Sequence, residues 1–183
     1  MVVRGAWERS RCSLAVDLRA LGEHECAREL HSDTLVRRQR VLGKDHPDTL
    51  LSANNLANNL SALGQHEQAR DLHEDTLTRR RRVLGDDHPS TLRSAHKLAA
   101  DLHELGHYAQ ARQLDEDALV RSRRLFGDEH PFTRLSAMNL AADLRALGEH
   151  DQLYELEQWI KAQHPSRTRP TLRPGPDSHS APE

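Results

Sequence analysis

The sequence predicts an all-α solenoid of about four antiparallel helix pairs, and three observations lead to this fold class. First, the chain repeats at a period of 42 residues, and Gly43, Gly85 and Gly127 open three similar units. Second, apolar residues within each unit recur at the spacing of a helix face. Third, only 36% of the residues are hydrophobic and 30% are charged. That composition suits stacked helices, which bury narrow stripes, better than a sandwich or a barrel.

The first helix of each pair is clearest in the second unit. The residues that share one helix face there are Ala53, Leu56, Ala57, Leu60 and Leu63. Pro47 stands where a proline is tolerated in the first turn of a helix. Gly64 can adopt the left-handed conformation that ends a helix. We therefore expect a helix near residues 47–63.

A second apolar stripe predicts the other helix of the pair, near residues 66–84. It consists of Ala69, Leu72, Thr76, Leu77, Val83 and Leu84, and it stops at Gly85. Small residues recur where the two helices of a pair meet, namely Ala15, Ala27, Ala57, Ala69, Ala99 and Ala111. Larger side chains would overpack that contact, so we expect the two helices to approach closely there.

The solenoid is expected to span residues 6–164, followed by a disordered tail, residues 165–183, that is rich in proline and serine. The units are about 6–42, 43–84, 85–126 and 127–164. In the last unit Leu153 replaces the small alanine and Lys161 takes an apolar stacking position, as a terminal repeat with a solvated outer face requires. The first unit lacks the Asp-His-Pro opening, so the N-terminal end of the stack looks uncapped. A second copy of the chain, bound through this end, is one alternative for the partner.

The pattern LAxxLxxLG, followed by xAxxL and a loop with proline, resembles the tetratricopeptide repeat (TPR) family. It is carried in the second unit by Leu56, Ala57, Leu60, Gly64, Ala69 and Leu72. The 42-residue unit and the LGxDHPxTL joint resemble the kinesin light chain type of this family, and the array is similar to those of bacterial, especially actinobacterial, signalling proteins. The resemblance implies a right-handed superhelix whose first helices line a concave groove that binds peptide segments or partner proteins.

Carried over by position, the resemblance implies a set of groove residues. They are Leu51, Asn54, Asn58, Ser61, Arg93, His96, His103, Leu135, Met138 and Arg145, with Ala100 and Ala142 at the same positions. These positions vary between units while the buried stripe stays constant, as expected of sites that face solvent or a ligand. Asn54 and Asn58 lie one turn apart, where both could bond the backbone of an extended peptide. The alternative for each residue is an ordinary solvated position.

The 13 histidines raise the question of a metal site. Six recur at fixed places, with His46, His88 and His130 before proline and His24, His66 and His150 after the turn. Their recurrence favours capping and packing. His96, His103 and His107 share part of a face, but Gly106 interrupts the helix and no cysteine or carboxylate completes a ligand set in the sequence. We expect no metal and no cofactor.

Arginines gather at Arg79–Arg82 and at the corresponding positions of the neighbouring units. A surface for nucleic acid or for an acidic partner is one interpretation. However, the run lies at a helix end that favours cations, and Asp33, Asp75 and Asp117 each precede an arginine by four residues. Aromatic residues for base stacking make up only 3%. We expect a solvated face, with nucleic acid as the weaker alternative.

Catalytic patterns are missing from the sequence. It contains no GxxxxGK[ST], GxGxxG or GxSxG motif. Cys12 falls on the predicted groove, but a reactive thiol needs an activating environment that the sequence does not show. We therefore expect the protein not to be an enzyme.

Together these observations predict a non-enzymatic protein-interaction module whose partner is a protein or peptide. Two cysteines are too few for a disulfide framework, and no apolar run approaches the length of a membrane span, so we expect a cytoplasmic protein that does not bind a membrane. One alternative is a regulatory or sensor fragment of a larger signalling NTPase system. A nucleic-acid or acidic-partner binder, acting through the arginine-rich helix ends, is less favoured.

Overall fold

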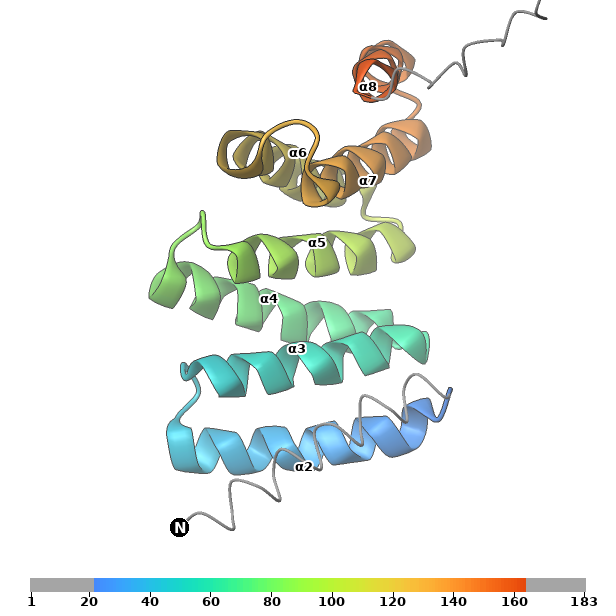
Figure 1. The fold of residues 1–183 in the computed structure, drawn as a ribbon. Helices are drawn as coiled ribbons and strands as arrows, with labels where there is room; N and C mark the ends of the chain where they lie inside the picture. The colour runs from blue at the N-terminus through green and yellow to red at the C-terminus, as the bar shows by residue number, and fades with distance from the viewer. Residues whose placement is uncertain (1–21, 164–183) are drawn as a thin grey trace, which may run out of the picture.

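The computed structural model describes residues 22–163 of the chain, and within this range it contains seven α-helices. In chain order they are α2 (His24–Leu42), α3 (Pro47–Ala62), α4 (His66–Leu84), α5 (Pro89–Glu104), α6 (Tyr108–Phe126), α7 (Pro131–Leu147) and α8 (His150–Ala162). The helices stack one upon another in the order of the chain (Figure 1). The expected all-α repeat fold is confirmed. The first helix of the unit 6–42, the tail 165–183 and the end expected to self-associate lie outside the described residues.

The helices alternate between two sets, which we call the A helices (α3, α5 and α7) and the B helices (α2, α4, α6 and α8). Each helix packs against the one before and after it, and each A helix also contacts the next A helix. The stack turns as it rises, since α3 lies across the view in Figure 1 whereas α8 is seen nearly end on. The A helices therefore follow one another along a shared, twisted side of the stack.

The Asp-His-Pro joints, which read Glu-His-Pro before α7, begin the A helices. The Nδ1 atom of His88 accepts a hydrogen bond of 3.1 Å from the backbone N–H of Ser90, and His46 and His130 cap α3 and α7 in the same way. Each histidine thus satisfies a donor that the first turn of a helix leaves free. Gly85, at the end of α4, has φ 83° and ψ 165°, a region that is open essentially to glycine alone. The expected capping role of these histidines is confirmed.

The apolar core is narrow and consists mainly of leucine and alanine. The recurrent alanines at the contacts between A and B helices are 0–1% exposed; they are Ala27, Ala57, Ala69, Ala99 and Ala111. At the end of the stack, Trp159 and Ile160 of α8 pack against Leu140 and Leu144, and Lys161 stays exposed. The guanidinium of Arg123 lies 4.8 Å from the centre of the Trp159 ring. The last helix therefore covers the core while its outer side remains polar.

Polar side chains complete the packing between repeats. Arg80 of α4 is buried and donates hydrogen bonds to the hydroxyl of Ser94, at 2.7 Å, and to the backbone carbonyl of Ser90, at 3.0 Å. Arg38 of α2 reaches Ser52 in the same manner, at 2.9 Å. Both arginines extend from a B helix to the following A helix. They thereby connect consecutive repeats.

The arginine run has partners within the fold. Arg79 binds Asp75, four residues earlier, at 2.7 Å, and the joint residue Asp45 at 3.0 Å. The partners of the other three are Ser94 for Arg80, Asp86 for Arg81 and Asp45 for Arg82. Arg121 of α6 repeats the arrangement with Asp117 and Asp87. The expected pairs at a spacing of four are thus confirmed for α4 and α6, and they favour the structural interpretation of the run.

His88→Ala is expected to lower the free energy of unfolding by about 1 kcal/mol, because the N–H of Ser90 loses its acceptor. His88→Asn restores an acceptor that suits this position and should recover most of the loss. Urea unfolding followed by circular dichroism measures both values.

His107→Ala provides the control for this measurement. His107 also precedes a helix, but its side chain makes no capping hydrogen bond. Its removal should change stability less than that of His88. An equal loss in the two alanine variants would show that the capping bond is not what stabilises the joint.

Candidate functional site

The ten predicted groove residues lie in three kinds of environment. Exposed on the A helices are Leu51, Arg93, Leu135, Met138 and Arg145. Half-buried are Asn58, Ser61 and His103. Asn54 and His96 are buried, with exposed fractions of 6% and 5%. Successive A helices are in contact, and side chains at their flanks are covered by the neighbouring repeat. The expectation that all ten face solvent or a ligand therefore does not hold for Asn54 and His96.

Two of the half-buried residues connect neighbouring A helices. Ser61 of α3 donates a hydrogen bond of 2.6 Å to Oδ1 of Asp101 in α5. His103 of α5 lies one repeat later, and its Nδ1 is 2.6 Å from Oδ1 of Asp143 in α7. The same position thus makes the same bridge in two consecutive repeats. These variable positions set the contact between repeats as well as lining the surface.

Sequence reasoning missed three buried aspartates, namely Asp101 and Asp143, to which these two bridges lead, and Asp115. Asp101 accepts from Ser61 and also pairs with Nδ1 of His73, at 2.6 Å. Asp115 pairs with Nδ1 of His96, at 2.9 Å. A signal was present, since Asp101 and Asp143 fall at one repeat position, directly before a buried leucine of the stripe. A charge recurring there needs a partner from another helix.

The aspartates differ in the direction in which the fold shifts their acidity. Burial alone would raise the pKa of Asp101, but the hydrogen bonds with His73, Ser61 and His66 outweigh it and hold the pKa below its ordinary value. Burial raises the pKa of Asp115. Burial also raises the pKa of Asp143 to about 6 against the opposing bond with His103, and the charge of Asp115 adds to the rise.

One set of contacts has the order of a catalytic triad. Nε2 of His96 lies 2.9 Å from the hydroxyl of Ser136, and Nδ1 of His96 lies 2.9 Å from Asp115. Ser136 is 0% exposed, however, and it also donates to the carbonyl of Phe132 at 3.1 Å. A nucleophile needs access to a substrate and donors for an oxyanion. We therefore assign these contacts to packing between repeats. Arg38 and Arg80, which bond a serine of the following A helix, are replaced in the third unit by Ser122. His96 bonds the corresponding serine, Ser136, instead.

A cavity of about 180 Å³ lies between α5 and α7 on the side of the A helices, and we call it the acidic cavity. It is lined by Ala100, His103 and Glu104 of α5, Asp115 of α6, and Asn139, Ala142 and Asp143 of α7. Ala100, His103 and Ala142 belong to the predicted groove positions. The structure thus brings groove positions of two consecutive repeats together around a cluster of carboxyl groups.

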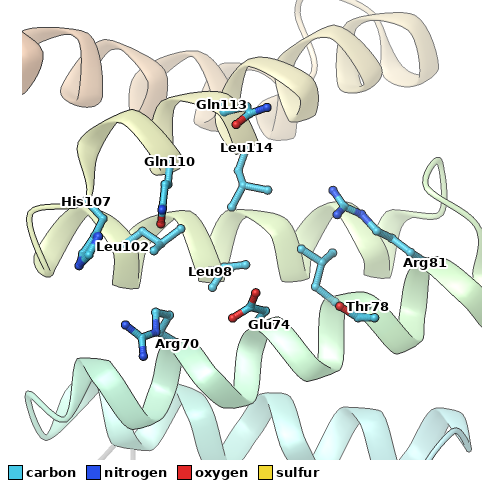
Figure 2. Close-up of a pocket in the computed structure, with 11 residues that line it drawn as sticks. Arg70, Glu74, Thr78, Arg81, Leu98, Leu102, His107, Gln110, Gln113 and Leu114 are labelled. Atoms are coloured by element: carbon cyan, nitrogen blue, oxygen red, sulfur yellow. The ribbon is translucent and has the colours of Figure 1, made fainter.

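A larger cavity, of about 610 Å³, lies between the B helices α4 and α6 (Figure 2). Leu98 and Leu102 of α5 and Leu114 of α6 give it apolar walls, and Arg70 and Glu74 of α4 stand at its polar edge. No sequence pattern predicted this cavity. It is separate from the predicted groove because the residues at its polar edge come from B helices.

Residues 22–163 contain neither a metal-binding cluster nor a membrane-spanning helix. This part of the chain has no cluster of three or more histidine, cysteine, aspartate or glutamate residues placed to hold a metal ion. None of its helices combines the length and apolar character that crossing a bilayer requires. Cys26 is an exposed free thiol, whereas Cys12, a predicted groove position, lies outside the described residues.

Comparison with known proteins gives one family and several similar folds. A family model described as a tetratricopeptide repeat matches residues 8–82, 53–119 and 94–152. None of the curated protein sequences matches the chain. Among solved structures, a Podosopora anserina protein described as a kinesin light chain with nearly identical TPR-like repeats is 23% identical. That match has a TM-score of 0.57 and covers 88% of this chain and 96% of the other.

Two other solved structures are similar in fold. BtubC (BKLC) from P. vanneervenii is 17% identical, with a TM-score of 0.79 over 96% of this chain and 69% of its own. Bacillus thuringiensis PlcR, in complex with the peptide PapR7 and DNA, is 12% identical, with a TM-score of 0.57 over 86% of this chain and 69% of its own. At these identities the likeness concerns the fold alone.

The parent chain is expected to lose stability as the pH rises through the pKa of Asp143, and Asp143→Asn should abolish this dependence. The pKa of Asp143 is raised from 3.8 to about 6, so the folded chain binds more protons than the unfolded chain between these values. Stability from this group is therefore complete below about pH 4 and is lost as the pH rises through about 6. The loss amounts to at most about 3 kcal/mol at neutral pH. Urea unfolding from pH 4 to 7 measures it, and the variant should show the flatter profile.

Asp101→Asn is the matched control, because Asp101 occupies the same repeat position and its pKa is shifted downward. Its contribution is present above the ordinary pKa of aspartate and is lost only in more acidic solution. This variant should therefore lose a constant amount of stability from pH 4 to 7. An Asp143→Asn profile as steep as that of the parent chain would contradict the assignment.

Proposed function

The chain belongs to the tetratricopeptide repeat family, with 42-residue units of the kinesin light chain type, and we propose that it is a non-enzymatic module that binds a peptide segment of a partner protein. The binding surface is the groove along the A helices. The fold supports a protein-interaction role, since a stack of rigid repeats presents an extended surface. PlcR, which shares this fold, is itself in complex with the peptide PapR7 and DNA.

The observation that carries the proposal is a column of exposed side chains along the A helices. Leu51, Arg93 and Leu135 occupy one repeat position in α3, α5 and α7, and all three are exposed. Leu51 is 48% exposed, Leu135 46%, and nearby Met138 of α7 59%. Large apolar side chains that recur at one position of a stack form a surface that a ligand can cover. The varied residues along the column would set which peptide fits.

The polar members of the surface suit an extended backbone. Asn58 of α3 is half-buried, so the residue keeps partial access to solvent. An asparagine side chain both donates and accepts hydrogen bonds and can therefore pair with a peptide unit. Arg145 of α7 is exposed and bonded to Glu157 at 3.0 Å. An acidic residue of a bound segment could compete for this arginine.

Replacing Leu51, Leu135 and Met138 together with serine is expected to weaken peptide binding by at least about tenfold, because apolar contact area is lost at three points. The ligand is the best binder selected from a random peptide library on the parent chain. Its affinity for each variant is measured by fluorescence anisotropy.

The matched control replaces three exposed valines of B helices with serine, namely Val36, Val41 and Val120. These changes remove a similar apolar area away from the groove, so affinity should stay that of the parent chain. Circular dichroism verifies that both triple variants are folded. Equal binding by the two folded variants would place the peptide elsewhere, with the cavity of Figure 2 as the next surface to examine.

A further inference from the structure

Asp143 differs from its counterpart one repeat earlier in the partners that surround it. Both oxygens of Asp101 are bonded, Oδ1 by Ser61 and His66 and Oδ2 by His73. Asp143 pairs with His103 through Oδ1 only. Its Oδ2 is buried, and no donor among the described residues reaches it. A buried carboxylate oxygen without a donor is an unusual arrangement that calls for an explanation.

The missing donor follows from one difference between the repeats. His73, the residue that bonds Oδ2 of Asp101, corresponds in the next unit to Asp115. An acceptor and negative charge therefore replace a donor beside Asp143, and the charge of Asp115 contributes to its raised pKa. In acid, one proton shared between Asp115 and Asp143 gives both carboxyl groups a hydrogen bond. At neutral pH that proton is lost, and the space beside the two carboxylates favours a positively charged donor from elsewhere.

The acidic cavity adjoins this place and is open toward the groove. Asp143 and Asp115 line it, exposed Glu104 stands at its edge, and Asn139 adds an amide group. Ala100 and Ala142 are small and leave room for an incoming side chain. Neither lysine nor arginine occurs in the lining among the described residues, and the printed partners of Asp115 and Asp143 there are the histidines His96 and His103.

We propose that the acidic cavity binds the cationic side chain of an arginine or lysine from the peptide in the groove, which makes the inference dependent on the proposed function. The cation would donate hydrogen bonds to Oδ2 of Asp143 and lie close to the carboxyl groups of Asp115 and Glu104. A planar guanidinium suits two neighbouring carboxyl groups better than an ammonium, because its donors are fixed in a fork. Arginine is therefore the preferred residue.

Binding of this kind is linked to pH. The titratable groups that face the cavity are His103 and Glu104 of α5, Asp115 of α6 and Asp143 of α7. Acidification protonates Asp143 and so removes one of the negative charges that attract the cation. Because the pKa of Asp143 is about 6, affinity should fall between pH 7.5 and 5.

The test uses capped single amino acids as probes, namely the N-acetyl methylamides of arginine, lysine and glutamine. Each is titrated into the ¹⁵N-labelled full chain at pH 7.5, and binding is followed by NMR. Capped arginine should shift the side-chain amide of Asn139 and the backbone amides of Ala100 and Ala142. Capped lysine should act at the same place more weakly, and capped glutamine should have no comparable effect.

Three variants locate the response. Glu104→Gln and Asp143→Asn should each weaken the affinity for capped arginine about tenfold, since each removes a charged acceptor. Glu104 is exposed, so this variant remains informative even if the change at Asp143 disturbs folding. Glu74→Gln removes an exposed carboxylate from the cavity between B helices and should leave the response unchanged.

The inference is overturned by an equal response to capped glutamine, by a response to capped arginine that Glu104→Gln leaves intact, or by no response to capped arginine. The inference and the proposed function can be contradicted separately. Groove peptides without arginine or lysine, together with no response to capped arginine, would keep the proposed function and remove this inference. A response at the acidic cavity with no peptide bound in the groove would support the cation site and remove the proposed function.

Discussion

The stack depends on hydrogen bonds between polar side chains that are buried where one repeat meets the next. Leucine and alanine stripes supply a narrow core, and nearly as many polar as apolar side chains are buried beside them. Each such group left unpaired costs stability, so pairing between repeats stabilises the stack. Arg80 with Ser94 and Ser61 with Asp101 are such pairs across successive repeats. Each repeat is therefore stable in the presence of its neighbours.

The same hydrogen bonds connect the fold to the candidate site. The side chains that connect one A helix to the next lie beside the predicted groove. One residue can therefore stabilise the contact between repeats and also line the groove surface. His103 does both, since it bonds Asp143 and lines the acidic cavity. Where His73 of one repeat is replaced by Asp115 of the next, a second buried carboxyl group lies beside Asp143 and helps to raise its pKa. We therefore expect recognition chemistry at the places where the repeats differ.

Helices were predictable because their causes are local. The stripe spacing, the proline after each capping histidine and the glycines placed the boundaries of α3 and α4 to within one residue. The site was less predictable, because burial of Asn54 and His96 depends on how closely one A helix approaches the next. The pairing of His96 with Asp115 and of Asp143 with His103 likewise joins residues 19 and 40 positions apart. Periodicity shows that such positions vary, but it does not show what lies opposite them.

The ion pairs at the joints bear on how such an array can evolve. Asp45 is bound by Arg79 and Arg82, and Asp87 by Arg121 and Arg124, so each pair closes within a single 42-residue unit. A gene duplication that copies one unit therefore copies both halves of its ion pairs. The array can lengthen or shorten by whole units without leaving these charges unmatched. Other contacts, such as Arg80 with Ser94 and Arg81 with Asp86, join one unit to the next, so a new junction must supply these partners again.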